Sequence, residues 1–249
     1  MSAWHIAAIF AAGIAAGAIN TVVGSGTLIT FPILLAFGYR PVTANVSNTV
    51  GLVPGAVSGA AGYRRELAGQ RERVLAAGGA AVCGGTVGSV LLLVLPESAF
   101  KAIVPFFIAL ALVLIVLQKQ ITRAVGDHRR GQGERVSAGT LLGIFCCGIY
   151  GGYFGAAQGI LVLAVLGFGI DDKLQRLNAV KVITTGLANL VAGVVFVIAA
   201  HVAWDVAGLI AAGSLIGGGI GARFGRVLPP SALKALIVVV GVTAIVRLV

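Results

Sequence analysis

Residues 94–101 read Val-Leu-Pro-Glu-Ser-Ala-Phe-Lys, and residues 227–234 repeat them as Val-Leu-Pro-Pro-Ser-Ala-Leu-Lys, 133 positions later. Four further residues recur at the same offset, as the pairs Gly84 and Gly217, Gly85 and Gly218, Gly88 and Gly221, and Asn45 and Asn178. Nearer the start of each copy the offset is 131 residues, because one loop is two residues longer in the second copy. The chain is therefore expected to consist of two related halves, residues 1–117 and 136–249.

The composition is that of a membrane protein. The 249 residues are 58% hydrophobic and 10% charged, whereas a soluble domain carries about 25% charged residues. Eight apolar stretches are close to the roughly 20 residues that a spanning helix needs. They are Met1–Val23, Ala44–Gly62, Val74–Leu95, Ser98–Leu117, Val136–Phe154, Leu177–Ala200, Val206–Ala222 and Ser231–Val249. We therefore expect an all-α polytopic protein in a lipid bilayer.

Other classes of protein fit the chain poorly. No basic residue precedes Arg40, so Met1–Val23 is expected to be an integral helix rather than a signal peptide. The three cysteines show neither metal-ligand spacing nor a disulfide framework. The net charge of +10 lies in short loops, where the positive-inside rule accounts for it without a nucleic-acid partner. No metal or other cofactor is expected.

Two apolar pieces, Thr27–Phe37 and Ala156–Phe168, are too short to span comfortably, and they leave two topologies open. If each piece crosses or re-enters separately, each half has about five helical elements, the halves are inverted, and 14 Lys and Arg residues are cytoplasmic against 3 outside. If each piece merges with its neighbour, the halves are parallel and the ratio falls to 10 to 7. Cytoplasmic loops are enriched in Lys and Arg. We therefore expect two inverted repeats with 8–10 membrane segments and both termini outside.

The longest polar run, Gln118–Arg135, separates the two halves. Its glycines and basic residues are typical of a solvated loop. The sequence predicts a cytoplasmic basic linker over residues 118–135.

Two glycine-rich stretches at equivalent positions, Thr21–Thr27 and Gly151–Gly159, predict helix breaks inside the membrane. Backbone broken at membrane depth must be buried in protein or line a cavity, and paired breaks in two halves are typical of secondary transporters. Each helix that resumes after a break begins with free N–H groups, which favour an anion. The alternative is that the glycines only let helices pack closely. We prefer that alternative for Gly84, Gly85, Gly88 and their partners.

Charged residues are nearly absent from the apolar stretches. All eight acidic residues fall in loops or at helix ends, and Lys181 alone lies inside a span, on one helix face with Asn178. An intramembrane lysine is a candidate functional residue, although its side chain could also extend to the interface. Asn45 and Asn48 occupy the corresponding polar helix start in the first half. One amine, several neutral donors and no carboxylate favour a small anion.

The chain resembles the TauE/SafE sulfite-exporter family, also called TSUP permeases. The resemblance rests on Gly24-Ser25-Gly26 followed by residues 31–35 and 44–49, and on Gly148–Gly159 followed by residues 178–181. It implies a permease of the bacterial cytoplasmic membrane that imports or exports sulfite, thiosulfate, sulfoacetate or other organosulfonates. This chain departs from the family pattern at Ala156-Ala157-Gln158, where a more glycine-rich run is usual, and Leu163 stands where the first half has Pro32.

The resulting hypothesis is a secondary permease for a small anion, with alternating access and no enzymatic activity. Its candidate substrate-binding residues are Gly24, Ser25, Gly26, Thr27, Asn45, Asn48, Gly155, Gln158, Asn178 and Lys181. The rivals are a passive anion channel and a membrane scaffold or accessory subunit. Homodimerisation is left open.

Overall fold

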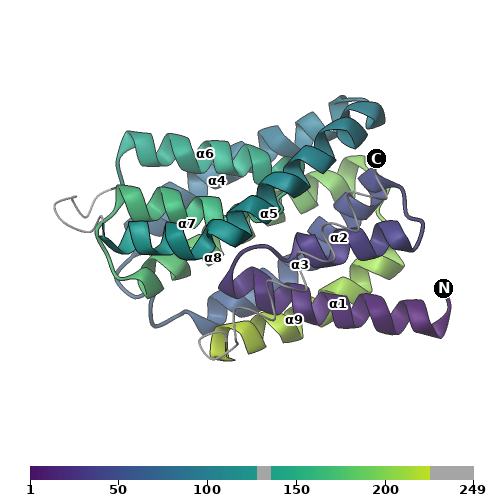
Figure 1. The fold of residues 1–249 in the computed structure, drawn as a ribbon, viewed down its shortest axis with the longest axis horizontal. Coiled ribbons are helices and arrows are strands. Elements are labelled where there is room, and N and C mark those ends of the chain that lie inside the picture. Colours follow the sequence, from purple (N-terminus) through teal and green to yellow (C-terminus); the bar gives the residue numbers. More distant parts are fainter. Residues whose placement is uncertain (128–135, 225–249) are drawn as a thin grey trace.

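The computed structural model describes residues 1–127 and 136–224, and every regular element in these ranges is an α-helix. The first half contains α1 (Ala3–Val22), α2 (Thr27–Ala36), α3 (Pro41–Gly62), α4 (Arg71–Val94) and α5 (Glu97–Asp127). The second half contains α6 (Ala138–Tyr153), α7 (Gln158–Gly169), α8 (Leu174–Ala199) and α9 (Trp204–Phe224). The all-α prediction is confirmed (Figure 1). The predicted span Ser231–Val249 and the second copy of the repeated motif lie outside the described ranges.

Within those ranges, α1, α4, α5, α8 and α9 are long and apolar enough to cross a membrane. Helices α2, α6 and α7 are apolar but shorter. Helix α3 has 22 residues, but it carries the polar run Asn45-Val46-Ser47-Asn48-Thr49, which is buried inside the bundle. Large apolar side chains such as Ile198 and Val94 are exposed on the outside, as expected for a lipid-facing surface. The chain is a multi-pass membrane protein.

Both short helices fold back beside the helix that precedes them. Helix α1 ends at Val22, the chain turns at Gly24 with φ +83°, and α2 returns so that Phe37 packs against the His5 ring at 4.4 Å between centroids. In the second half the chain turns at Gly155 with φ +76°, and α7 returns to the start of α6, where Gly169 packs against Thr140. Each short segment therefore forms a hairpin with the helix before it, as expected for a re-entrant segment.

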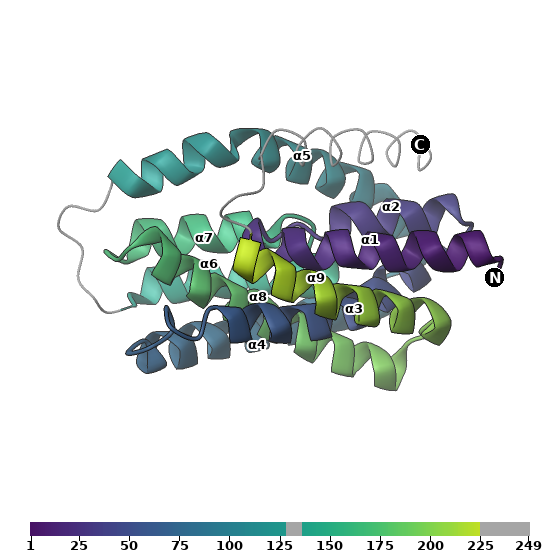
Figure 2. The same cartoon turned by 90° about the horizontal axis from the view of Figure 1, so that it is seen from below.

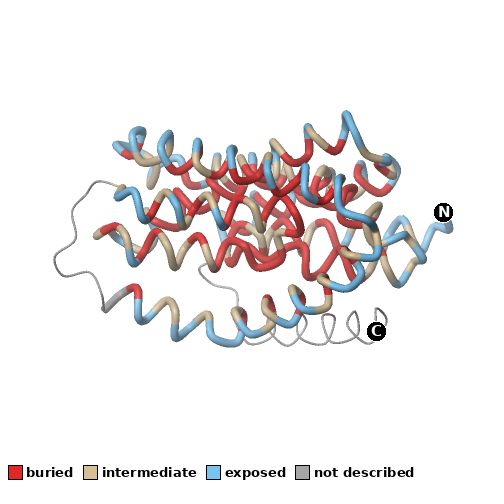
Figure 3. Tube along the Cα trace, turned by 90° about the horizontal axis from the view of Figure 1, so that it is seen from above, coloured by how far each residue is buried: buried red, intermediate tan, exposed pale blue. Residues whose placement is uncertain are grey.

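The two helical hairpins, α1–α2 and α6–α7, enter the bundle from opposite ends. Figures 1 and 2 show α2 near the N-terminus and α7 at the far end of the long axis, with the turns of both hairpins near the middle. Figure 3 shows that the buried residues also concentrate in this middle region. Three buried aromatic side chains, Phe31, Phe100 and Phe154, pack there, with the Phe31 and Phe154 ring centroids 5.2 Å apart.

Each hairpin is packed against a helix of the other half. Helix α9 packs on α1, and α4 packs on α6, through glycines that face the partner's backbone. The backbone contacts are Gly217 with Ile14, Gly221 with Ala18, Gly84 with Phe145 and Gly88 with Ile149. The first two contacts become the last two when the offsets of 133 and 131 residues are applied. The close-packing interpretation of these glycines is confirmed, and the matched contacts support the inverted repeat, which stays a prediction.

The predicted linker is partly wrong. Helix α5 continues to Asp127, so residues 118–127 are helical rather than a loop. Ile121 and Val125 are four residues apart on the inner face, and the buried Val125 packs against Gly167 of α7. Apolar contacts on one face maintain the helix although its other face is polar. Residues 128–135 of the predicted linker lie outside the described ranges.

Candidate functional site

The turns of the two hairpins touch each other. The Gly159 N–H donates a hydrogen bond to the Gly24 carbonyl oxygen at 3.0 Å, which joins the start of α7 to the break between α1 and α2. Neither residue has room for a side chain, because a Cβ on Gly24 would overlap the Gly159 backbone and a Cβ on Gly159 would meet Gly24. We call the two turns, together with the helix ends that lead into them (residues 21–27 and 151–159), the hairpin tips. The sequence-predicted breaks are therefore adjacent in space.

Lys181 of α8 lies against both hairpin tips. Its side chain is fully buried, and Nζ donates hydrogen bonds to the carbonyl oxygens of Thr21 at 3.0 Å and Val22 at 3.4 Å. These are among the last carbonyls of α1, which a helix leaves without an intrahelical partner and which carry the negative end of its dipole. A Cβ on Gly159 would lie 3.1 Å from Lys181 Cδ. The amine therefore points to the centre of the bundle and not to the interface.

Asn45 of α3 makes the corresponding contact with the other hairpin. Its Nδ2 donates to the carbonyl oxygen of Tyr153, the last residue of α6, at 2.9 Å. Each helix that ends at a tip is thus capped by a polar side chain from the opposite half. Both capping side chains are fully buried.

Asn48 holds the start of α2. Its Nδ2 donates to Thr27 Oγ1 at 3.2 Å, and its Oδ1 accepts a short hydrogen bond from Thr30. Of the first-half candidates, Gly24, Ser25, Gly26 and Thr27 form the tip, and Asn45 and Asn48 contact the tips from α3.

Two predicted side chains point elsewhere. Gln158 is the first residue of α7, but its Nε2 donates to the Cys147 carbonyl oxygen of its own hairpin at 3.0 Å. Asn178 donates from Nδ2 to the Tyr63 hydroxyl at 2.9 Å, beside the loop between α3 and α4. The structure therefore does not bring these two side chains together with Lys181 between the tips.

The backbone donors are less available than the sequence suggested. The N–H groups of Leu28 and Ile29 donate to the carbonyl oxygens of Ser25 and Gly26, and the Gly159 N–H is taken by the opposite tip. An anion that uses the Gly159 N–H must displace the Gly24 carbonyl.

Three buried polar atoms have no hydrogen-bond partner within the described ranges: Ser25 Oγ, Asn45 Oδ1 and Tyr153 Oη. Buried polar atoms are nearly always paired, so unpaired ones mark positions where a bound group could contribute. Ser25 lies in the first tip, and Asn45 and Tyr153 form the cap of the second. In the same part of the chain, no group of His, Cys, Asp and Glu has the arrangement of a metal site.

Three residues at the tips were not among the candidate binding residues: Thr21, Thr30 and Tyr153. Thr21 and Tyr153 lie within the predicted breaks, whereas Thr30 was missed altogether. Thr21 and Tyr153 contribute backbone carbonyls, for which side-chain chemistry gives no signal. Thr30 follows Gly26 by one helical turn, and this spacing could have indicated that it shares a face with the break.

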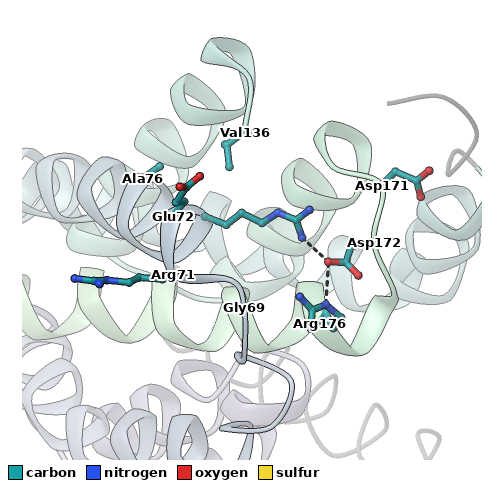
Figure 4. A pocket seen from close by; sticks show the side chains of 9 residues that line it. Gly69, Arg71, Glu72, Ala76, Val136, Asp171, Asp172 and Arg176 are labelled. Atoms are coloured by element: carbon teal, nitrogen blue, oxygen red, sulfur yellow. Dashed lines mark hydrogen bonds and ion pairs between the residues drawn. The ribbon is translucent and has the colours of Figure 1, made fainter. Parts of the chain in front are cut away.

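The tips are closed off from water in this structure. Ser25, Asn48 and Lys181 have no exposed surface. A cavity of about 850 Å³ lies at one end of the bundle near the starts of α4 and α8 (Figure 4). Its lining contains Arg71, Arg73 and Arg176 but also Glu72, Asp171 and Asp172, so its charges balance. This cavity does not have the chemistry of an anion site.

Comparisons with known proteins agree with this architecture. The family model described as "Sulfite exporter TauE/SafE" matches residues 9–248. A "Probable membrane transporter protein ORF9" of Sinorhizobium sp. is 27% identical over 99% of this chain and 93% of its own length. A "Probable membrane transporter protein" of Haemophilus influenzae is 27% identical over 94% and 90%. The "Probable membrane transporter protein YfcA" of Escherichia coli K12 is 23% identical over 93% and 85%.

No solved structure matches the chain. The family match nevertheless covers both hairpins, the polar starts of α3 and α8, and the helices between them. On this evidence, the chain belongs to the TauE/SafE sulfite exporter family.

Proposed function

We propose that this protein is a secondary transporter that moves a small anion across the bacterial cytoplasmic membrane by alternating access. The anion is sulfite, thiosulfate, an organosulfonate or a carboxylate. One observation carries the proposal: two hairpin tips meet inside the bundle with the buried amine of Lys181 against both. The family match and the names of the relatives support transport as the activity.

The chemistry around the tips favours an anion over a cation. Lys181 forms no ion pair with any of the described carboxylates, and its present partners are two backbone carbonyls. An anion that reaches the tips exchanges these neutral acceptors for a charged one, which forms a stronger hydrogen bond. The Ser25 hydroxyl can donate a further bond, and α2 and α7 present the positive ends of their dipoles.

The arrangement also suits alternating access. Each hairpin reaches the middle from its own end, and the recorded backbone hydrogen bond between the tips is the one from Gly159 to Gly24. Rocking one half against the other separates the tips on one side at a time. Following the positive-inside rule, the proposed cytoplasmic end is the one with residues 63–73 and 170–176, which leaves both termini outside.

Transport in proteoliposomes tests the proposal. Purified protein is reconstituted with sulfite, thiosulfate, sulfate, sulfoacetate, taurine and lactate in turn, and flux is followed against concentration. Lys181→Met is expected to reduce flux of the transported anion by at least about tenfold. The substitution removes the buried cation, and the bound anion then loses more than about 1.4 kcal/mol of interaction energy. Lys173→Met is the control, since it removes an exposed lysine from the start of the same helix.

Three outcomes would contradict the proposal. Equal flux in Lys181→Met and Lys173→Met would remove the amine from the mechanism. Flux that never saturates would indicate a passive channel, and absence of flux together with absence of anion-dependent thermal stabilisation would favour a scaffold or accessory subunit.

A further inference from the structure

A cluster of polar contacts joins the two halves at the end of the bundle that carries the 850 Å³ cavity. Asp172, in the loop between α7 and α8, accepts hydrogen bonds from Arg73 of α4 and from Arg176 Nε of α8, the latter at 3.0 Å (Figure 4). The Arg73 and Asp172 side chains are only 13% and 14% exposed. The carboxylate therefore lies between two guanidinium groups, one from each half.

Neighbouring bonds strengthen this junction. Arg176 Nη1 donates to the Ala68 carbonyl oxygen at 3.1 Å, and Gln70 Nε2 donates to the Arg176 carbonyl oxygen, also at 3.1 Å. Arg73 in turn donates to Gln70 Oε1 at 3.2 Å. Arg176 is thus tied by its side chain and its backbone to the loop between α3 and α4.

The opposite end of the bundle has no comparable ionic junction in the described ranges. There the Ala203 N–H at the start of α9 donates to Ser47 Oγ of α3 at 2.9 Å, a contact between neutral groups. The one ion pair recorded near that end, Lys101 with Glu97, lies within α5. The charged connection between halves is therefore confined to the cavity end.

We infer that Asp172 is the centre of an ionic latch that keeps the cavity end of the bundle closed, and that its release from Arg73 exposes the hairpin tips to that side. The latch comprises Asp172, Arg73, Arg176 and Gln70. Without the carboxylate, two guanidinium groups would face each other in a largely buried place, which is strongly unfavourable. The adjoining cavity provides space in which the separated groups can be hydrated. In the transporter proposed above, this latch is the gate on the basic side.

The latch depends on the Asp172 carboxylate, which stays negatively charged at neutral pH. Burial raises the pKa of Asp172, but the hydrogen bonds from Arg176, the Lys173 N–H and Arg73 outweigh it and hold the pKa below the usual aspartate value. A lowered pKa means that the pair stabilises the folded state above the usual aspartate pKa and loses this contribution only as the pH falls through the lowered value. Among the other charged groups that line the cavity are Arg71, Glu72 and Asp171. Opening at neutral pH therefore requires movement or competition for the arginines and not protonation of Asp172.

A buried reporter cysteine tests the latch without any substrate. The native cysteines, Cys83, Cys146 and Cys147, are replaced by serine, and Ala77→Cys is introduced on α4, one turn beyond Arg73, at a fully buried position. The protein is placed in nanodiscs, where both ends are accessible, and the rate of labelling by a charged maleimide is measured. The latch variant is Asp172→Asn. Its matched control is Asp171→Asn, because Asp171 lines the same cavity and points away from Arg176 in Figure 4.

Asp172→Asn is expected to raise the labelling rate by about tenfold, as loss of a largely buried pair predicts, and Asp171→Asn is expected to leave it unchanged. Arg73→Gln, with Arg71→Gln as its control, breaks the same pair from α4 and decides the question if Asp172→Asn does not fold. Equal rates in each variant and its control would overturn the latch. Because labelling needs no transport, that result would leave the proposed anion transport standing, and loss of transport alone would leave the latch standing.

Discussion

At the residue scale, glycine serves two separate purposes in the hairpins. Gly24 has φ +83°, a conformation that costs an L-amino acid about 1–2 kcal/mol, and its Cα also approaches the backbone of Gly159. Gly38 has nearly the same φ, +86°, but a Cβ there would meet nothing within 4 Å. Substitutions at Gly24 and Gly38 therefore distinguish the effect of backbone strain from the effect of close backbone approach.

Gly24→Ala is expected to lower the thermal unfolding temperature clearly more than Gly38→Ala. Both substitutions introduce strain at positive φ, but only the first also forces two hairpin tips apart, which adds about 1–3 kcal/mol of overpacking. The measurement is a thermal unfolding scan of both variants in one detergent. Equal shifts would mean that the contact between the tips contributes little to stability.

The residue types around the tips could be predicted, but their partners could not. A lysine within an apolar span and asparagines at equivalent helix starts are visible in the sequence, and the structure buries Lys181, Asn45 and Asn48. The partners of the Gln158 and Asn178 side chains could not be predicted. The position of a residue in a helix fixes the face on which its side chain lies, but not which carbonyl or hydroxyl group the side chain will contact. Ala157 has φ +57° although alanine disfavours this region, so glycine content alone understates the sharpness of this turn.

At the element scale, two pairs of helices pack through glycine so closely that backbone touches backbone. Gly84 of α4 faces the Phe145 carbonyl of α6, and Gly217 of α9 faces the Ile14 carbonyl of α1. On the same helices, Gly79 and Gly219 have open space where a Cβ would be. Gly84 and Gly217 therefore contribute to the close approach of the helices, whereas Gly79 and Gly219 do not.

Gly84→Ala and Gly217→Ala are each expected to destabilise the protein by about 1–3 kcal/mol, because backbone atoms cannot move aside as a flexible side chain can. Gly79→Ala and Gly219→Ala should be neutral or slightly stabilising, since alanine favours helix more than glycine does. Unfolding temperatures of the four variants test this. A loss at one contact and not at its counterpart would contradict the matched packing of the two halves.

Most helices could be predicted because apolar length and glycine breaks are local signals. The predicted short piece Thr27–Phe37 corresponds to α2 at Thr27–Ala36, and Ala156–Phe168 to α7 at Gln158–Gly169. The end of α5 was misplaced by ten residues, because polar residues after Leu117 suggested a loop. The helix persists through the contact of Val125 with Gly167, a tertiary contact that no local pattern reveals.

At the scale of the whole molecule, the charges and the hairpins define two different ends. One end carries most of the Lys and Arg residues of the described loops and helix ends. Figure 1 shows the loop between α3 and α4, the start of α8 and the ends of α5 and α9 toward this end. These segments carry Arg64, Arg65, Arg71, Arg73, Lys119, Arg123, Lys173, Arg176 and Arg223, whereas the loop before α3 and the start of α5 carry Arg40 and Lys101. Hairpin α1–α2 belongs to the end with few charges, and α6–α7 belongs to the basic end (Figures 1 and 2).

In the proposed transporter, two re-entrant hairpins enter the membrane from opposite faces and meet around the buried amine of Lys181. Arg40 and Lys173 test this arrangement most directly, since they are separated by 133 residues, precede α3 and α8 as N-caps, and are exposed. Single cysteines, Arg40→Cys and Lys173→Cys, are placed in the cysteine-free protein and labelled with a membrane-impermeant maleimide in intact cells and in inside-out vesicles. Arg40→Cys is expected to label only in intact cells and Lys173→Cys only in inside-out vesicles. Labelling of both cysteines from the same face would mean that the hairpins do not enter from opposite faces.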